Sequence, residues 1–187
     1  MEQNTEKGLI KQIIEGDTAL YSYFVKQYAD KIFGMIYKIV RCSAESEELT
    51  QDVFLKAFNN LKKYQGKSQF STWLYRIAYN TAISSTRKKR ILYPAINDSL
   101  LNNISDNEVD KVFSHEDNET LVLKLEKALS QLEPEEKSLI TLFYYSDKSV
   151  QDISEIMDIS QANVKTKLYR VRKKLLALIK LDGYEKG

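Results

Sequence analysis

The stretch SVQDISEIMDISQANVKTKLYRVR, residues 149–172, predicts a helix-turn-helix. Its first part is a short amphipathic helix whose apolar residues recur every three or four positions: Val150, Ile153, Ile156 and Met157. Asp158 and Ile159 form the turn, and Ser160 is a favourable N-cap for a second helix. That helix carries an apolar stripe with the same spacing: Val164, Leu168, Val171, Leu175 and Leu178. The pattern is typical of proteins that read duplex DNA.

The face opposite this stripe is small, polar and cationic. Seven basic residues and no acidic residue lie between positions 159 and 181. In the usual docking geometry the first turns of such a helix enter the major groove, where four side chains can reach base edges: Lys165, Thr166, Tyr169 and Arg170. Asn163 lies beside them, and Arg172, Lys173 and Lys174 are placed to contact phosphates. The alternative is a solvated basic end that only complements the helix dipole.

The chain that precedes this motif is almost entirely helical in pattern. Two helices, Leu121–Leu132 and Pro134–Tyr145, complete a four-helix domain over residues 120–187, and Pro134 suits a first helical turn. No glycine lies between Gly66 and Gly183, so the tight turns that join β-strands are scarce. We therefore expect an all-α fold with two helical domains, residues 1–93 and 120–187. Residues 94–119 are predicted to be a flexible acidic linker, because seven acidic residues there face one lysine.

Composition excludes several classes of protein. The 187 residues include one cysteine, Cys42, and one histidine, His115, so neither a disulfide framework nor a zinc cluster can be built. No glycine-rich phosphate loop occurs, and we expect no enzyme activity, no cofactor and no metal. The first residues lack the apolar core of a signal peptide, and no apolar run is long enough for a membrane span. These features favour a cytoplasmic protein.

A helix from about Ser46 in the N-terminal domain has two different faces. One face is apolar and is predicted to be buried: Leu49, Val53, Phe54, Ala57, Phe58 and Leu61. The other face is polar except for one leucine: Glu48, Asp52, Leu55, Lys56 and Asn59. A single exposed leucine is common on protein surfaces. Set among charges, Leu55 could also anchor a partner protein, and both interpretations stay open.

Two stretches together resemble one protein family. Residues 46–54 (SEELTQDVF), with residues 70–78 (FSTWLYRIA) and Asn80, resemble region two of extracytoplasmic-function sigma factors of bacterial RNA polymerase. Residues 132–136 (LEPEE), with the helix-turn-helix, resemble region four of the same family. The two motifs occur in the order found in the family. This resemblance implies that the protein directs core RNA polymerase to promoters and helps to open the DNA strands.

The resemblance also implies a role for each exposed face. The polar face of the helix from Ser46 would bind core polymerase. The loop at residues 64–69 and the helix that follows it would bind the melted strand of the minus-ten element: Tyr64, Ser68, Trp73, Arg76, Asn80, Ser84 and Arg87. The last helix would read the minus-35 element: Asn163, Lys165, Thr166, Tyr169, Arg170 and Lys173. Trp73 is equally compatible with a mainly structural role.

The chain departs from the family pattern in the turn of the second motif. Asp158 stands where the family often has glycine, and Ser154 where it often has alanine. Aspartate tolerates a left-handed backbone better than most residues, so we expect the turn to be kept. In the family the linker threads through the RNA-exit channel, where acidic residues would imitate RNA; a plain solvated tether is the alternative. An exposed polymerase-binding face would also allow an anti-sigma factor to bind.

Two other classes of protein fit parts of the sequence. A transcription regulator would bind duplex DNA alone through the helix-turn-helix, but that class lacks the set of residues from Trp73 to Asn80. An RNA-binding or scaffolding helical protein would find its best support in the basic run at residues 86–90 (TRKKR). Specific duplex binding by the isolated protein would favour the regulator.

Overall fold

The computed structural model describes residues 2–88 and 119–184, and every regular element within these ranges is helical. The eight α-helices are α1 Glu2–Glu15, α2 Tyr21–Val40, α3 Ser43–Asn59, α4 Phe70–Lys88, α7 Glu119–Ser130, α8 Pro134–Ile140, α9 Val150–Met157 and α10 Gln161–Tyr184. Three short turns join them: the 3-10 turns η1 Thr18–Leu20 and η2 Leu61–Lys63, and the π-helical turn η3 Thr141–Tyr145. The prediction of an all-α, two-domain fold is confirmed. Residues 94–118 of the predicted linker lie outside the described residues.

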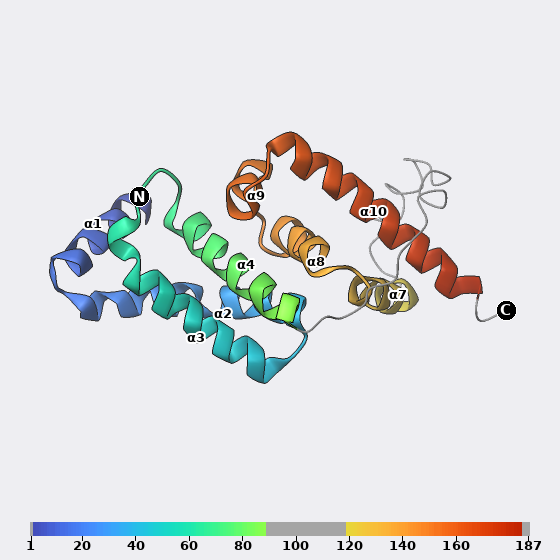
Figure 1. Cartoon of the computed structure of the whole chain (residues 1–187), viewed down its shortest axis with the longest axis horizontal. Coiled ribbons are helices and arrows are strands. Elements are labelled where there is room, and N and C mark those ends of the chain that lie inside the picture. Colours follow the sequence, from blue (N-terminus) through green and yellow to red (C-terminus); the bar gives the residue numbers. More distant parts are fainter. Residues whose placement is uncertain (1, 89–118, 185–187) are drawn as a thin grey trace.

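The N-terminal half is built around α2, α3 and α4, which pack side by side (Figure 1). Each helix contributes apolar residues from one face, as its periodicity predicts. The rings of Phe24 in α2 and Phe70 in α4 are fully buried or nearly so, and their centroids lie 4.4 Å apart. Val53 and Ala57 of α3 are completely buried. The hydrophobic effect on these faces therefore holds the three helices together.

A left-handed residue separates α2 from α3. Arg41 has φ 59° and donates its backbone N–H to the carbonyl of Tyr37 at 2.9 Å, which closes the last turn of α2. Cys42 is extended, and α3 starts at the next residue. This tight connection lets α3 run back along α2, so its polar face points to solvent.

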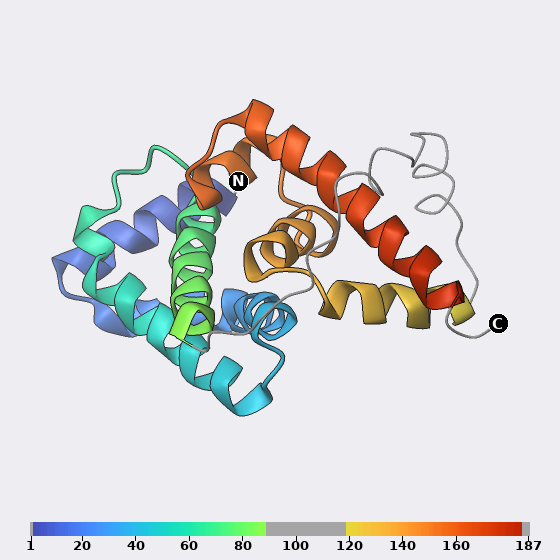
Figure 2. The same cartoon turned by 45° about the vertical axis from the view of Figure 1, so that its right-hand side comes forward.

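The C-terminal half contains α7, α8, α9 and α10. Figure 2 shows α10 on the outer side of the molecule, with α9 at its start and α7 beside its far end. The helix predicted from Pro134 to Tyr145 is α-helical only as far as Ile140; the last five residues form the π-helical turn η3. The helix-turn-helix is formed by α9 and α10, with the stripe from Val164 to Leu178 buried as expected.

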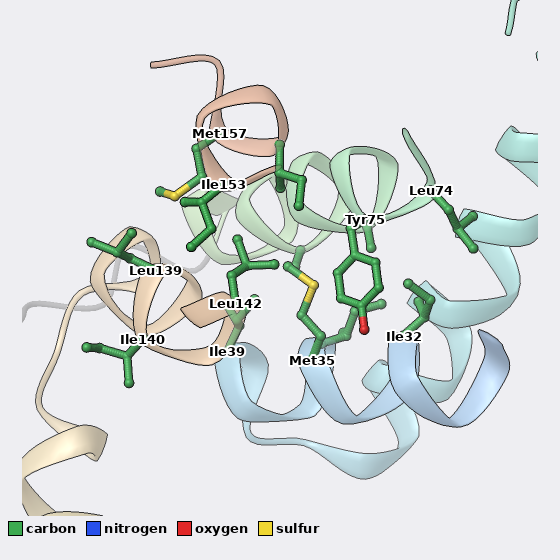
Figure 3. Close-up of a cluster of buried hydrophobic side chains, with 14 of the residues drawn as sticks. Ile32, Met35, Ile39, Leu74, Tyr75, Leu139, Ile140, Leu142, Ile153 and Met157 are labelled. Carbon is green, nitrogen blue, oxygen red and sulfur yellow. The ribbon is translucent and has the colours of Figure 1, made fainter. Parts of the chain in front are cut away.

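The two halves share one continuous hydrophobic cluster. Figure 3 shows Met35 and Ile39 of α2 lying next to Leu142 of η3, with Leu139 of α8 and Ile153 of α9 beside them. All five side chains are buried. The N-terminal half is therefore packed directly against the helix-turn-helix half. The sequence did not predict this arrangement.

Candidate nucleic-acid interface

The first turns of α10 present the side chains predicted to read duplex DNA. Ser160 caps the helix, since its hydroxyl oxygen accepts a hydrogen bond from the backbone N–H of Asn163 at 3.2 Å. Five of the six predicted residues are exposed and the sixth, Lys173, is half-buried: Asn163, Lys165, Thr166, Tyr169, Arg170 and Lys173. The Thr166 hydroxyl donates to the carbonyl of Ala162 at 3.0 Å, which fixes its rotamer. This face is open to a duplex.

The turn before α10 holds both departures from the family pattern. Asp158 has φ 59° and ψ 45°, a left-handed conformation, and its backbone N–H closes the last turn of α9 on Ser154. The Ser154 hydroxyl donates to the carbonyl of Ile159 at 2.5 Å, so it bridges the same turn. The turn is kept with aspartate at position 158, as expected, and the Ser154 hydroxyl adds a hydrogen bond across it.

The loop between α3 and α4 is held by tyrosine and glycine. Gly66 has φ +67°, and the Tyr64 hydroxyl donates to the carbonyl of Ser68 at 2.7 Å. Burial, with a smaller contribution from Glu6, raises the pKa of Tyr64, so its hydroxyl stays protonated and keeps donating. A cavity of about 420 Å³ lies between this loop and the start of α9. Ser68 is half-buried at its edge.

The Trp73 ring lies against the loop rather than free in solvent. It is half-buried, with its centroid 5.3 Å from that of Tyr64 and 5.6 Å from that of Phe70. Such aromatic packing stabilises the loop and leaves part of the indole exposed. Trp73 therefore has a structural role, whichever further role it serves.

The remaining predicted residues of α4 form an exposed row: Arg76, Asn80, Ser84 and Arg87. Both arginines of this row meet carboxylates of the C-terminal half. The Arg76 guanidinium lies 3.3 Å from the Asp158 carboxylate, and the Arg87 guanidinium lies 3.1 Å from the Glu135 carboxylate. Thr72 also donates a hydrogen bond to Asp152 at 2.8 Å. The sequence did not predict these contacts between the two halves. The one hint in the sequence was Asp158, an acidic residue at a turn where glycine is more usual.

The polar face of α3 is exposed as predicted: Glu48, Asp52, Leu55, Lys56 and Asn59. Leu55 is 61% exposed, and it is the one large apolar side chain of this helix that is exposed. The Lys56 ammonium donates to the Thr81 hydroxyl at 3.2 Å, so it also joins α3 to α4.

Residues 2–88 and 119–184 contain neither a metal-binding cluster nor a membrane-spanning helix. No group of three or more His, Cys, Asp or Glu residues in these ranges is arranged to hold a metal ion. None of the helices described there is long and apolar enough to cross a membrane. His115 lies outside the described residues.

Comparisons with known proteins match both halves of the chain. Residues 24–91 match the family model for sigma-70 region 2, and residues 123–175 match the model for sigma-70 region 4. The chain is 31% identical over 175 residues to the ECF RNA polymerase sigma factor SigW of Bacillus subtilis. The aligned region covers 90% of this chain and 94% of SigW.

Solved structures have the same fold. CnrH in complex with the cytosolic domain of CnrY superposes with a TM-score of 0.63 at 17% identity, covering 93% of this chain and 96% of CnrH. The sigma factor RpoE in complex with the anti-sigma factor NepR from Bartonella quintana gives a TM-score of 0.62 at 19% identity, covering 87% of this chain and 98% of RpoE.

Proposed function

Because this chain belongs to the extracytoplasmic-function sigma factors, which direct RNA polymerase to promoters, we propose that its exposed faces read the two elements of one promoter. The observation that carries this proposal is the capped helix α10, whose first turns expose a polar and cationic face. A cationic helix at the end of a helix-turn-helix fits the major groove and the phosphates on either side of it.

The upstream, minus-35 element is assigned to α10. Arg170 and Lys165 match the acceptors of guanine in the major groove, and Tyr169 and Thr166 reach neighbouring positions. Lys173, beside the Tyr169 ring at 4.8 Å, lies further along the helix and contacts phosphate. Asn163 lies at the start of the same face.

The downstream, minus-ten element is assigned to the loop at residues 64–69 and to α4. Strand opening there requires a base to leave the stack, which costs a few kcal/mol and must be offset by contacts in a pocket. Tyr64 and Trp73 offer ring surfaces, Ser68, Asn80 and Ser84 offer hydrogen bonds, and Arg76 and Arg87 offer positive charge to the backbone.

Core RNA polymerase is assigned to the exposed face of α3. Leu55 supplies an apolar anchor that is surrounded by Glu48, Asp52, Lys56 and Asn59. Interface anchors generally lie near the centre of the contact and are surrounded by residues that exclude water. We assign core binding and the minus-ten element to a domain of residues 1–93, and the minus-35 element to a domain of residues 120–187. Residues 94–119 join the two domains.

Further partners follow from the family. RpoE of Bartonella quintana was solved with an anti-sigma factor, and we extend that kind of partner to this chain. A sigma factor acts on polymerase and promoter DNA, so we assign the protein to the cytoplasm. Sigma factors are initiation factors, so we assign no catalytic residue to the chain.

The test is transcription in vitro with bacterial core polymerase, with and without this protein, on a pool of genomic fragments. Transcripts that start at a fixed distance from a shared two-part motif are expected. Arg170→Ala should reduce use of the upstream element, and Asn80→Ala should impair opening while core binding stays intact. Lys62→Ala, an exposed lysine of η2, is the control. Specific duplex protection by the protein alone, without core-dependent transcription, would instead identify a regulator.

A further inference from the structure

We propose that Arg172 and Lys174 of α10 are positioning residues: they fix the rotation of this helix about its own axis, and so decide which side chains face the DNA. They act through contacts with Tyr144 of η3 and Glu136 of α8, within the helix-turn-helix half, rather than through contacts with phosphate. The inference rests on the proposed function, since it concerns the face assigned to the minus-35 element.

Lys174 turns its ammonium onto α8, which packs against α10. Its side chain is only 11% exposed, and the Nζ atom donates to the Glu136 carboxylate at 2.8 Å. The Glu136 side chain is itself 25% exposed. An ammonium that is paired and nearly buried is poorly placed to meet the DNA backbone. The charge that the sequence pattern assigns to a phosphate is therefore used inside the domain.

The start of α8 fixes the carboxylate that receives Lys174. The same Glu136 oxygen, Oε2, also accepts a hydrogen bond from the backbone N–H of Glu133 at 3.0 Å, as part of the capping box of α8. One carboxylate therefore closes the first turn of α8 and holds Lys174 at the same time. This is the first tie between α10 and the rest of its domain.

Arg172 makes a second tie, to η3. Its Nε atom donates to the Tyr144 hydroxyl at 2.6 Å. Its guanidinium also lies over the rings of Tyr144 and Phe143, 5.5 Å and 5.9 Å from their centroids. A guanidinium over an aromatic ring is attracted to its face. The π-helical turn η3 thus supplies the partner on this side of α10.

The two ties lie on opposite flanks of the buried stripe of α10. At about 100° per residue, position 172 lies about 80° to one side of the middle of the stripe from Val164 to Leu178, and position 174 lies about 80° to the other side. The base-reading residues Thr166 and Tyr169 lie on the far side of the helix. Because α10 is held on both flanks, the ties oppose its rotation in either direction and keep that far side turned to the DNA.

Rotation of α10 matters because contacts with bases are geometrically stricter than contacts with phosphates. A bidentate contact with guanine needs two donors aligned with two acceptors, and a hydrogen bond weakens steeply as its angle falls. A lysine can reach a phosphate from many directions, because its ammonium is a point charge on a flexible stem. Loss of a tie should therefore reduce sequence discrimination more than affinity for DNA in general.

The test gives two neighbouring lysines the same substitution. Lys173→Met removes a residue assigned to phosphate, whereas Lys174→Met removes a tie. Core polymerase loaded with each full-length variant is bound to promoter fragments whose upstream element is intact or scrambled, at several salt concentrations. Lys11→Met, at an exposed position of α1, controls for the loss of one positive charge.

The two variants should fail in different ways. Lys173→Met should weaken binding to both fragments alike and lower the slope of log affinity against log salt by about 0.9. Lys174→Met should keep the wild-type slope and reduce the preference for the intact element about fivefold to a hundredfold, which is what one good base contact supplies. A variant that is merely less stable would bind both fragments less and leave their ratio unchanged.

A milder variant tests the second tie from the partner's side. Tyr144→Phe lies outside α10 and removes only the hydroxyl that Arg172 donates to. It should reduce the preference for the intact element about twofold to tenfold. This variant also keeps the proposal testable if Lys174→Met folds poorly.

Hydrogen exchange in the free chain gives a readout that needs no DNA. Amides in the first turns of α10 should exchange faster in Lys174→Met than in Lys173→Met, because a helix that has lost a tie leaves its packed position more often. Equal exchange in the two variants would overturn the proposal. So would an equal loss of salt slope, or a preference kept by Lys174→Met and Tyr144→Phe. If wild-type holoenzyme does not prefer the intact element, the assignment of α10 to the minus-35 element is refuted instead, and the exchange rates still decide whether the ties hold the helix.

Discussion

At the scale of single residues, the helix-turn-helix depends on polar side chains that satisfy the helix ends. Ser149 and Asp152 form a capping box at α9: the Ser149 hydroxyl accepts from the Asp152 backbone N–H at 3.1 Å, and the Asp152 carboxylate accepts from the Ser149 backbone N–H at 3.2 Å. Asp152 also joins the two halves through Thr72. One residue therefore serves both the motif and the boundary.

Replacing Ser149 with alanine should lower the free energy of unfolding by about 1 kcal/mol, since the first turn of α9 loses its capping hydroxyl. Urea denaturation followed by circular dichroism measures the change. Ser130→Ala is the control, because Ser130 is the exposed last residue of α7 and its hydroxyl caps no helix start. Equal stability of the Ser149 variant and wild type would contradict the role of the cap.

Acid should weaken the contribution of Asp152. Burial opposes ionisation of its carboxylate, but hydrogen bonds from Ser149 and Thr72 and the nearby Lys148 ammonium outweigh burial, and the pKa lies below the usual 3.8. A carboxylate with a lower pKa in the folded state stabilises the fold above its unfolded pKa, and this stabilisation disappears as the pH falls through the folded value. The stability advantage of wild type over Asp152→Asn should therefore shrink below about pH 4. An advantage unchanged between pH 6 and pH 3 would contradict it; Glu126→Gln is the control.

At the scale of helices, α3 has one face that is buried in the core and one face that is exposed to solvent. Its buried face packs Val53, Phe54 and Ala57 into the N-terminal core, while Leu55 points to solvent. Neighbouring residues 54 and 55 therefore have opposite environments, because successive residues of a helix lie about 100° apart.

Substitutions at these two neighbours should separate binding from stability. Leu55→Asp should abolish binding to core polymerase and change the free energy of unfolding by less than about 0.5 kcal/mol. Phe54→Ala should cost about 3 to 5 kcal/mol of stability, since it leaves a cavity in the core. Co-purification with core polymerase and urea denaturation measure the two effects. Core binding by the Leu55 variant at wild-type level would remove this face from the polymerase interface.

Periodicity predicted most of these helices and their faces, since burial follows from apolar spacing within each one. It did not predict η3, because a single π-helical turn at the end of an α-helix is too short to change the apolar pattern of residues 134–145 visibly. It also did not predict the pairs of Arg76 and Arg87, which join residues 82 and 48 positions apart (158 − 76 and 135 − 87). Polar contacts of such separation leave no local signal in one sequence.

At the scale of the whole molecule, one hydrophobic cluster runs through both halves, and this should make unfolding a single event. Met35 and Ile39 on one side and Leu139 and Leu142 on the other belong to the same buried set. When two halves share buried surface, loss of one exposes apolar area on the other. The halves therefore stabilise each other.

Wild-type unfolding by urea should give the same midpoint from two signals. Trp73 is the single tryptophan, so its fluorescence reports on the N-terminal half, whereas far-ultraviolet circular dichroism reports on all helices. Leu142→Ala, at a fully buried position, should cost about 2 to 5 kcal/mol and separate the two midpoints. Leu181→Ala, at an exposed position of α10, is the control. Separate midpoints in the wild type would show that the halves unfold independently.

The exposed ion pairs of Arg76 with Asp158 and of Arg87 with Glu135 have a consequence at high salt, given the proposed contact of these arginines with promoter phosphates. When the internal salt concentration rises, it screens exposed ion pairs and also weakens binding to DNA phosphates. The ion pairs with Asp158 and Glu135 and the contacts with DNA phosphates are therefore both weakened by salt. The balance between arginines paired within the chain and arginines bound to DNA then changes less than either interaction alone, so promoter use is expected to be partly buffered against changes in ionic strength.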